Sequence, residues 1–419
     1  MIQEILRGPL LLPRRDRTVT YIFDGALAID DLGKIAFSGA HAELVAQLGA
    51  DAPAPRASNR LILPPFLDIH THIPQHPIRG RFVEGVPRHA PEGRLLAGLK
   101  RNVFPAEARF AELAYAEQVT REFLADTLAS GVVGGVGWMT VHARAVARAM
   151  SILPPTWSIG FVQMSQNCPE NLRTDDENFE SDVSDLATRF GRRVVLSDRF
   201  AVAVPTPLRH RLSDLADQFG LRTQTHLNEQ VAEKRFVEES LYPGYDNYTD
   251  VYRRDGLLDH HAIAAHCIHM REPEYRILVE QRTSVAHCPT SNRELGSGVM
   301  DIESMLDWDI PFALATDVGA SPTTSMLAEM RVFLEVHKDL HASATPREAL
   351  YRATLAPAEI LFLTDEFGTL DAGMPASFIE VEPAKPCDAQ MSADAVIEHA
   401  LIDGTVRSVR VRGKILFPS

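Results

Sequence analysis

The sequence predicts an α/β fold, in which a (β/α)8 barrel of the TIM type accompanies a small β-sandwich built from both chain ends. Short alternating segments typical of β-strands occupy residues 1–64 and return in residues 369–419. Between them, residues 65–368 alternate short apolar strands with longer helical segments. This repetition is typical of a parallel barrel. We therefore expect a barrel domain at 65–368 and a composite sandwich domain at 1–64 and 369–419.

The two chain ends carry the same kind of pattern. Near the N-terminus, segments 21–23 and 27–29 are followed by a turn and by the strand-like segment 34–38. The tail returns to strand character at 377–381 and 406–417. Because neither end carries enough apolar strands to form a core alone, we expect the two ends to pair with each other.

Eight short apolar segments in the central part read as strands, and helical patterns separate them. The predicted strands are 66–70, 132–136, 158–163, 194–204, 222–225, 262–265, 283–286 and 311–315. Eight is the number that closes a TIM barrel. In that fold the active site lies at the carboxyl ends of the strands, so polar residues at these ends are candidates for chemistry.

Composition limits the class of protein. The 419 residues are 45% hydrophobic and 23% charged, as in an ordinary soluble globular protein. The net charge of -14 argues against a nucleic-acid partner and favours a small neutral substrate. The four cysteines form no C-x-x-C pair, and no apolar stretch is long enough to span a membrane. The basic cluster near the N-terminus follows an apolar run, which is the reverse of a signal peptide. We therefore expect a cytoplasmic protein with no membrane partner.

The strongest chemical signal is a pair of histidines at the end of the first barrel strand. His70 and His72 are separated by one residue, and alternate side chains of a strand point to the same face. Both can therefore bind one metal ion. An H-x-H triplet alone is weak evidence, so the assignment depends on the other strands.

Three later strands also end in polar groups. His226 closes the fifth strand, His266 the sixth and Asp317 the eighth. The expected metal ligands are His70, His72, His226 and Asp317, with one position left for water. Imidazole and carboxylate ligands suit Zn2+, with Fe2+ or Mn2+ as alternatives.

The same strand ends supply candidate proton carriers. A bound zinc ion lowers the pKa of its water to about 7, which supplies a nucleophile at neutral pH. Glu229, three residues after His226, is the candidate proton shuttle; the alternative is a solvated carboxylate at the start of a helix. His266 is expected to hold the attacking water or polarise the substrate. Asp317 is expected to accept the proton of the water as well as bind the metal.

Several stretches of this chain resemble the guanine deaminase family of the amidohydrolase superfamily. They are 68–75, 104–107, 199–201, 225–229, 265–269, 284–292, 295–298 and 316–319. The resemblance implies hydrolytic deamination of guanine to xanthine and ammonia, and a homodimer. It supports the roles of Glu229, His266 and Asp317, and it adds substrate contacts at Gln75, Arg199 and Phe200.

The resemblance also bears on the number of metal ions and on the substrate. Binuclear members of the superfamily bridge their metals with a lysine on the fourth strand, and this chain has no lysine between Lys100 and Lys234. We therefore expect one zinc ion per chain. Arg199 and the Gln75 carboxamide are expected to pair with the carbonyl oxygen and ring nitrogens of guanine, while Phe200 packs on the ring.

Two other functions remain open. A deaminase of another aminated heterocycle, such as a pterin, 8-oxoguanine or an aminotriazine, would use the same mechanism, because pocket shape rather than metal chemistry separates these substrates. A non-catalytic barrel scaffold is the second, since a fold alone never proves activity. Of the remaining histidines, His142, His269 and His287 are expected to pack in loops or behind the metal ligands, and others, including His76 and His337, to lie on the surface.

Overall fold

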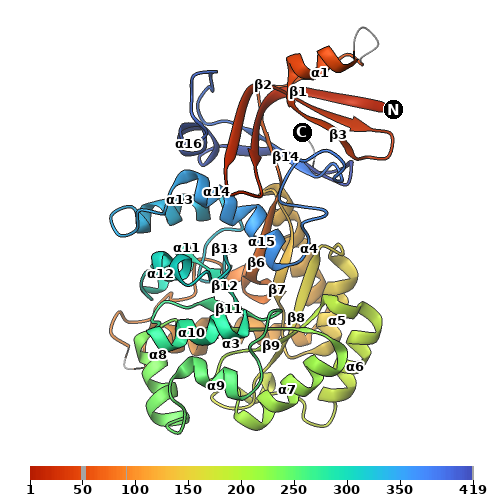
Figure 1. Cartoon of the computed structure of the whole chain (residues 1–419). Helices are drawn as coiled ribbons and strands as arrows, with labels where there is room; N and C mark the ends of the chain where they lie inside the picture. Colours follow the sequence, from red (N-terminus) through yellow and green to blue (C-terminus); the bar gives the residue numbers. More distant parts are fainter. Residues whose placement is uncertain (49–52, 91, 418–419) are drawn as a thin grey trace. The chain divides into compact units, whose positions relative to one another are not determined.

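The computed structural model describes residues 1–48, 53–90 and 92–417, and the chain forms two compact units (Figure 1). One unit comprises Met1–Leu67, Ala125–Val133 and the segment from Ser325 onward, and the other comprises Asp68–Leu124 and Gly134–Thr324. Every residue predicted above to bind metal, carry protons or contact substrate lies in the second unit. The domain boundaries at 64 and 369 stay a prediction.

Eight parallel strands, within the described residues, form the predicted barrel. They are β6 (Phe66–His72), β7 (Val132–Trp138), β8 (Trp157–Gln163), β9 (Val194–Asp198), β10 (Arg222–Leu227), β11 (Ile263–His266), β12 (Ser284–His287) and β13 (Phe312–Leu314), side by side in chain order. Beyond β13, the backbone N–H of Asp317 donates to the carbonyl oxygen of His70 at 2.8 Å. This bond brings the end of the last strand against the first, so the barrel is nearly closed.

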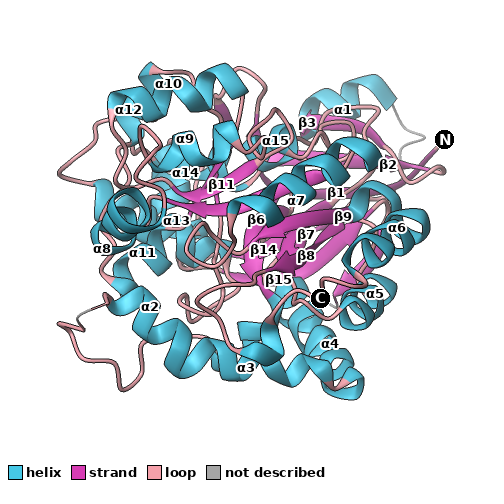
Figure 2. Ribbon diagram, turned by 90° about the horizontal axis from the view of Figure 1, so that it is seen from below, coloured by secondary structure: helices cyan, strands magenta, loops and turns pink. Residues whose placement is uncertain are grey.

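Helices lie outside these strands (Figure 2). The larger ones are α4 (Leu113–Ala129), α5 (Ala143–Ile152), α6 (Phe179–Phe190), α7 (Thr206–Phe219) and α10 (Glu272–Gln281). In α5, Ala145, Val146, Ala149 and Met150 are buried, at the three- and four-residue spacing of one helix face. α7 ends where Gly220 adopts a left-handed backbone with φ of 62°, a conformation that glycine takes without strain.

Shorter helical segments fill the connections. Between β6 and α4 they are η2 (Ile73–Ile78), α2 (Arg94–Gly98), the π-helix η3 (Leu99–Val103), α3 (Phe104–Ala108) and η4 (Arg109–Ala111). Later come η5 (Glu170–Leu172), η6 (Gly191–Arg193), α8 (Val231–Arg235), η7 (Phe236–Leu241), α9 (Tyr248–Arg254), α11 (Pro289–Leu295) and α12 (Ile302–Asp307). The segments that directly follow the carboxyl end of a barrel strand can form the walls of an active site.

A second, mixed sheet joins the two chain ends, as predicted. Its strands are β1 (Ile2–Pro13), β2 (Val19–Asp30), β3 (Ile35–Ala40), β4 (Arg56–Ala57), β5 (Leu61–Leu63), β14 (Phe378–Glu382), β15 (Thr405–Val411) and β16 (Lys414–Phe417), in the order β16-β15-β14-β5-β1-β2-β3 with β4 beside β1. The antiparallel pairing of β5 with β14 connects the ends. The same unit contains α1 (His41–Leu48), α13 (Met326–His337), α14 (Pro346–Ala353), α15 (Leu355–Ile360), α16 (Ala393–Val396) and η8 (Ile397–Leu401).

Strand alternation gives this sheet two apolar faces. On β2, Leu27 belongs to a cluster with Leu6 and Phe378, whereas its neighbour Ala26 packs with Ile5 and Leu44 of α1. Successive side chains of a strand point to opposite faces, which explains why adjacent residues enter different clusters.

One strand is shorter than the sequence predicts. The apolar run 194–204 reads as a single strand, but β9 ends at Asp198, and the following residues turn, with the N–H of Ala203 donating to the carbonyl of Phe200 at 2.9 Å. Residues 200–204 are nevertheless buried. The apolar character of residues 200–204 therefore indicates burial rather than a strand, because a buried turn also requires apolar side chains.

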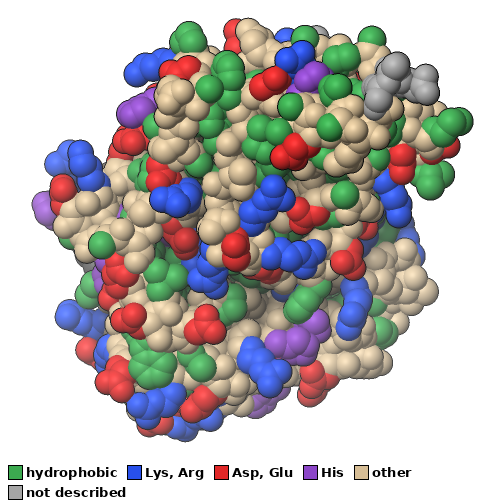
Figure 3. All heavy atoms as spheres, turned by 45° about the horizontal axis from the view of Figure 1, so that its top comes forward, with side chains coloured by type: hydrophobic (Ala, Val, Ile, Leu, Met, Phe, Trp, Pro, Cys, Tyr) green, Lys and Arg blue, Asp and Glu red, His purple; other side chains and the backbone are tan. Residues whose placement is uncertain are grey.

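The surface mixes charges of both signs. On the face shown in Figure 3, lysine and arginine side chains are interspersed with aspartate and glutamate, without a broad area of one sign. In the part of the chain that the structure describes, no helix combines the length and apolar character needed to cross a membrane.

Candidate active site

Four side chains that could hold a metal ion meet at one end of the barrel. His70 and His72 come from the end of β6, His226 from β10 and Asp317 from the loop after β13, and one ligand atom from each lies within 4.8 Å of the others. All four are buried. The sequence predicted this set, because each residue stands at the carboxyl end of a strand.

The distances within this group fit a divalent metal. Asp317 Oδ1 lies 3.4 Å from His70 Nε2 and 3.1 Å from His72 Nε2, and His72 Nε2 lies 3.2 Å from His226 Nε2. His70 Nε2 is buried and has no hydrogen-bond partner within the described residues. A buried polar atom without a partner is costly, and a metal ion would satisfy it. Three imidazoles and one carboxylate are ligands that zinc and related metals accept.

Neighbouring groups orient two of the rings. His226 Nδ1 lies 2.8 Å from the carbonyl oxygen of Arg199, which can only accept, so Nδ1 carries the proton and Nε2 presents a lone pair to the group. Trp138 donates its indole N–H to His70 Nδ1 at 3.0 Å and so holds the plane of that ring; with Nδ1 accepting, the proton of a neutral His70 lies on Nε2 and would have to leave that atom on metal binding. Such contacts fix the orientation of ligand side chains before a metal binds.

Burial favours the protonation states that a metal needs. It lowers the pKa of His70 and His226, and that of His72 to about 3, so these imidazoles are neutral near pH 7. Burial alone would raise the pKa of Asp317, but contacts with His70 and His72 outweigh it and hold that pKa well below its ordinary value. The group therefore offers neutral nitrogens and an ionised carboxylate.

The backbone is strained where these strands end. Asn228, His266 and Asp317 have φ values of 53°, 72° and 50°, in the left-handed region that residues other than glycine seldom adopt. Such residues cluster at functional sites, where the surrounding structure holds them in place. Here the strain lies beside the metal-ligand group.

Glu229 and His266 lie next to the metal-ligand group. Glu229 is only 1% exposed, so the alternative of a solvated carboxylate at the start of a helix is wrong. Its Oε1 accepts from the Ser297 hydroxyl at 3.0 Å, and its Oε2 lies 3.6 Å from His266 Nε2. His266 Nδ1 lies 2.9 Å from Asn292 Oδ1, which leaves Nε2 facing Glu229 and, at 4.0 Å, Asp317 Oδ2.

The two groups influence each other's pKa. Burial raises the pKa of Glu229 above the ordinary range of a carboxyl group. Burial would lower the pKa of His266, but the charges of Glu229 and Asp317 outweigh it and raise that pKa. A carboxyl group with a raised pKa can hold a proton and release it during a reaction.

The three predicted substrate contacts also lie here. Gln75 is on η2, and Arg199 and Phe200 follow β9; all three are at most 4% exposed. Glu107 of α3, for which no role was predicted, accepts from Gln75 Nε2 at 3.1 Å and lies 3.4 Å from Arg199. No local signal in the sequence marks that arrangement, because its three members are far apart along the chain.

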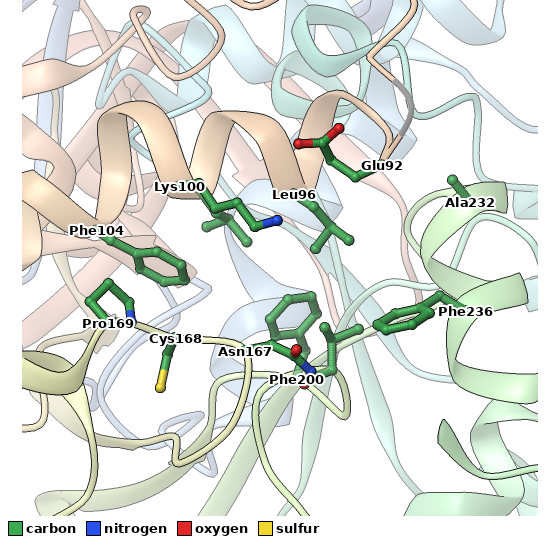
Figure 4. A pocket seen from close by; sticks show the side chains of 12 residues that line it. Glu92, Leu96, Lys100, Phe104, Asn167, Cys168, Pro169, Phe200, Ala232 and Phe236 are labelled. Atoms are coloured by element: carbon green, nitrogen blue, oxygen red, sulfur yellow. Dashed lines mark hydrogen bonds between the residues drawn. The ribbon is translucent and has the colours of Figure 1, made fainter. Parts of the chain in front are cut away.

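Two cavities adjoin this site. The inner one, of about 20 Å³, has room for about one water molecule. Its lining is His72, Gln75, Phe82, Leu95, Leu99, Arg199, Phe200, His226, Glu229, His266, Leu295 and Asp317. The outer one is about 540 Å³ and largely apolar; Figure 4 shows Phe104, Phe200 and Phe236 among its lining side chains. Leu99 and Phe200 line both cavities, so they separate the two.

Two histidines expected on the surface are buried instead. His76 is 2% exposed and lies edge-on to the ring of Phe123, with centroids 5.8 Å apart. His337 is fully buried and lies 4.9 Å from the ring of Phe333. A single histidine gives no signal of burial in a sequence, since its ring packs well against aromatic side chains.

A sequence profile of the Amidohydrolase family matches residues 61–416. The guanine deaminase of Escherichia coli (strain K12) is 31% identical over 371 residues, which cover 87% of this chain and 82% of that protein. This chain belongs to the guanine deaminase family of amidohydrolases.

Solved structures of guanine deaminases have the same fold. The Escherichia coli structure matches with a TM-score of 0.86 and 27% identity, covering 99% of both chains. A guanine deaminase from C. acetobutylicum, solved with guanine bound in its active site, matches with a TM-score of 0.85 and 23% identity, covering 99% of this chain and 100% of that one. The barrel and the mixed sheet are thus those of the guanine deaminase family.

Proposed function

We propose that this chain catalyses the hydrolytic deamination of guanine to xanthine and ammonia. One observation carries the proposal: a buried carboxyl group of raised pKa, Glu229, shares a cavity with the metal-ligand group and with Arg199 and Gln75. Such a reaction requires metal ligands, a proton carrier and polar groups that can form hydrogen bonds with a heterocycle. The family to which the chain belongs supports the choice of guanine.

We propose that His70, His72, His226 and Asp317 hold one zinc ion per chain. Iron and manganese are alternatives that suit the same ligands. When bound, the ion would polarise a water molecule and lower the pKa of that water to about 7, which makes it a nucleophile near neutral pH. The absence of a lysine between Lys100 and Lys234 supports a single ion.

Glu229 acts as the proton shuttle. Because burial raises its pKa, the carboxyl group can donate a proton to a ring nitrogen of guanine, which makes carbon 2 more electrophilic. Asp317 accepts a proton from the attacking water, and this proton is relayed to the amino group, which leaves as ammonia when the carbon–nitrogen bond breaks. The hydroxyl proton of the intermediate returns to Glu229 as the new carbonyl forms, so both carboxyl groups regain their starting states. His266 Nε2, which faces both carboxylates, positions the reacting groups by hydrogen bonding.

Arg199 and Phe200 select the heterocycle. Arg199 donates to the carbonyl oxygen of guanine, and Phe200 packs against the ring. Adenine lacks the carbonyl, so its binding would leave the Arg199 donor that faces the substrate without an acceptor. Where a site is built for such a hydrogen bond, the mismatch costs about 10⁴-fold or more in kcat/KM.

A substrate panel tests the proposal. Ammonia release is measured with guanine, adenine, 8-oxoguanine, a pterin and an aminotriazine, and guanine should give the highest kcat/KM, with adenine about 10⁴-fold lower. Arg199→Ala should lower the value for guanine severely and keep the metal, whereas Arg276→Ala, on the exposed side of α10, serves as the matched control. Turnover of a pterin or a triazine without turnover of guanine would overturn the substrate assignment. Absence of turnover with every compound would favour a non-catalytic scaffold.

We also propose that the protein is a cytoplasmic homodimer. Four cysteines without a disulfide framework suit a reducing compartment, and the family resemblance supports a dimer. Sedimentation equilibrium should give twice the chain mass of 46.4 kDa. A mass of one chain over the working concentration range would contradict the dimer.

A further inference from the structure

Glu107 contacts both Gln75 and Arg199, the two side chains proposed to form hydrogen bonds with the polar edge of the substrate. It lies on α3, is 3% exposed, and its Oε1 accepts from Gln75 Nε2 at 3.1 Å. The same oxygen lies 3.4 Å from Arg199 Nη2. One buried carboxylate oxygen is therefore shared by a carboxamide and a guanidinium.

This arrangement decides which atom of Gln75 is free. The carboxylate of Glu107 can only accept, so the amide nitrogen of Gln75 must face Glu107. Gln75 Oε1 is left buried without a hydrogen-bond partner within the described residues, and so is Arg199 Nε. Gln75 and Arg199, which both line the inner cavity, thus carry one buried acceptor and one buried donor without partners among the described residues, and both side chains contact Glu107.

A second contact restrains the amide from the other side. The backbone at Gly319 approaches Gln75 so closely that an added Cβ would lie 2.0 Å from Gln75 Oε1. Gly319 also has a φ of 129°, which only glycine adopts without strain. Glu107 and Gly319 together leave the carboxamide little freedom to turn over.

We propose that Glu107 is a positioning residue that fixes which atoms of Gln75 and Arg199 face the substrate. The site then accepts a heterocycle with a ring N–H next to a ring carbonyl and rejects a heterocycle that lacks this pair. In guanine that pair is N1–H and the carbonyl at carbon 6; Gln75 Oε1 accepts from the N–H, and Arg199 donates to the carbonyl. Gln75 thus accepts from the substrate. The inference rests on the proposed function.

The test uses a substitution that changes hydrogen bonding and keeps shape. In Glu107→Gln, the new carboxamide can donate as well as accept, so Gln75 is free to turn its N–H toward the substrate. The compared substrates are guanine and 2-aminopurine, which keeps the amino group at carbon 2 but lacks the carbonyl and the N–H at N1. Their ratio of kcat/KM measures edge selection directly.

We expect Glu107→Gln to lower the ratio of kcat/KM for guanine to kcat/KM for 2-aminopurine at least about tenfold. The change should come mainly from a raised KM for guanine, because the buried ring N–H of guanine loses Gln75 Oε1 as its acceptor. Metal content should not change. The control Glu112→Gln, an exposed residue just after η4, should leave the ratio as it is. An equal loss with both substrates, or no loss, would overturn the inference.

A second variant guards against a merely structural effect. Gln75→Glu combined with Glu107→Gln exchanges the two groups, and position 75 then offers only acceptor oxygens to the substrate. The ratio should recover by about tenfold relative to Glu107→Gln alone. A ratio that stays low would contradict the role of amide orientation.

Binding measurements separate this inference from the proposed function. The dissociation constants of guanine and 2-aminopurine, measured by calorimetry, need no turnover. If the wild type binds guanine but fails to deaminate it, the proposed function falls, and the ratio of dissociation constants still tests Glu107. If guanine is deaminated and Glu107→Gln leaves both ratios unchanged, the proposed function stands and the inference falls.

Discussion

Glu229 shows how burial turns an ordinary carboxyl group into a proton carrier. Ser297 donates to one of its oxygens, and His266 faces the other. Burial then raises its pKa. Its spacing from His226 predicted the place of this group, and its 1% exposure excludes a solvated role.

Glu229→Gln should keep the metal and lower kcat for guanine by about 10²-fold or more, because the proton shuttle is lost while the ligands remain. Metal content by mass spectrometry and steady-state kinetics check this result. Glu239→Gln on η7, a side chain that is 70% exposed, should behave as the wild type. Near wild-type turnover of Glu229→Gln with normal metal content would show that another group moves the proton.

The sequence predicted individual residues well where one strand rule applies, and poorly where distant residues meet. His70 and His72 could be assigned because alternate residues of a strand share a face. Glu107 could not, since its contacts with Gln75 and Arg199 exist only after η2, α3 and the turn after β9 come together. The burial of His76 likewise depends on Phe123 of α4.

At the scale of elements, the loop after β13 does more than deliver Asp317. Thr316 donates its backbone N–H to Asp68 Oδ1 at 3.2 Å, and Asp317 donates to the His70 carbonyl, so the loop is fixed to the first strand. Gly319 then passes against Gln75. The loop therefore couples one metal ligand to one substrate contact.

Gly319→Ala should disturb substrate binding and spare the metal. The added methyl group would lie 2.0 Å from Gln75 Oε1, so Gln75 must move. A displacement of that size in a positioning group costs up to about 10²-fold in kcat/KM. Guanine kinetics and metal content measure both effects, with Gly244→Ala, where nothing lies within 4 Å, as the control. An unchanged kcat/KM would mean that Gln75 adapts without cost.

Strand boundaries illustrate what a pattern of apolar residues can report. The existence and order of all eight barrel strands followed from alternating strand and helix patterns. The end of β9 did not, because residues 200–204 are as apolar as a strand while forming the buried turn that carries Phe200 to the site. Hydrogen-bond partners, which single-sequence patterns do not reveal, decide between strand and turn.

At the scale of the whole molecule, the barrel brings together residues that are far apart in the chain. Each parallel strand ends at the same side, so ligands from β6, β10 and the segment after β13 converge without any local sequence signal joining them. Similarity to the guanine deaminase family indicates the substrate, whereas the contacts among Glu107, Gln75 and Arg199 are seen only in the structure. The pairing of the two chain ends was predictable, whereas β1 and β5, the strands that link them in the sheet, were not among the predicted segments.

We propose that one metal ion, held by His70, His72, His226 and Asp317, supports the deamination of guanine. Metal-free protein can be titrated with Zn2+ while xanthine formation from guanine is followed. Activity should rise linearly and level off at one zinc ion per chain. Activity that levels off only at two ions, or no xanthine at any zinc content, would contradict it.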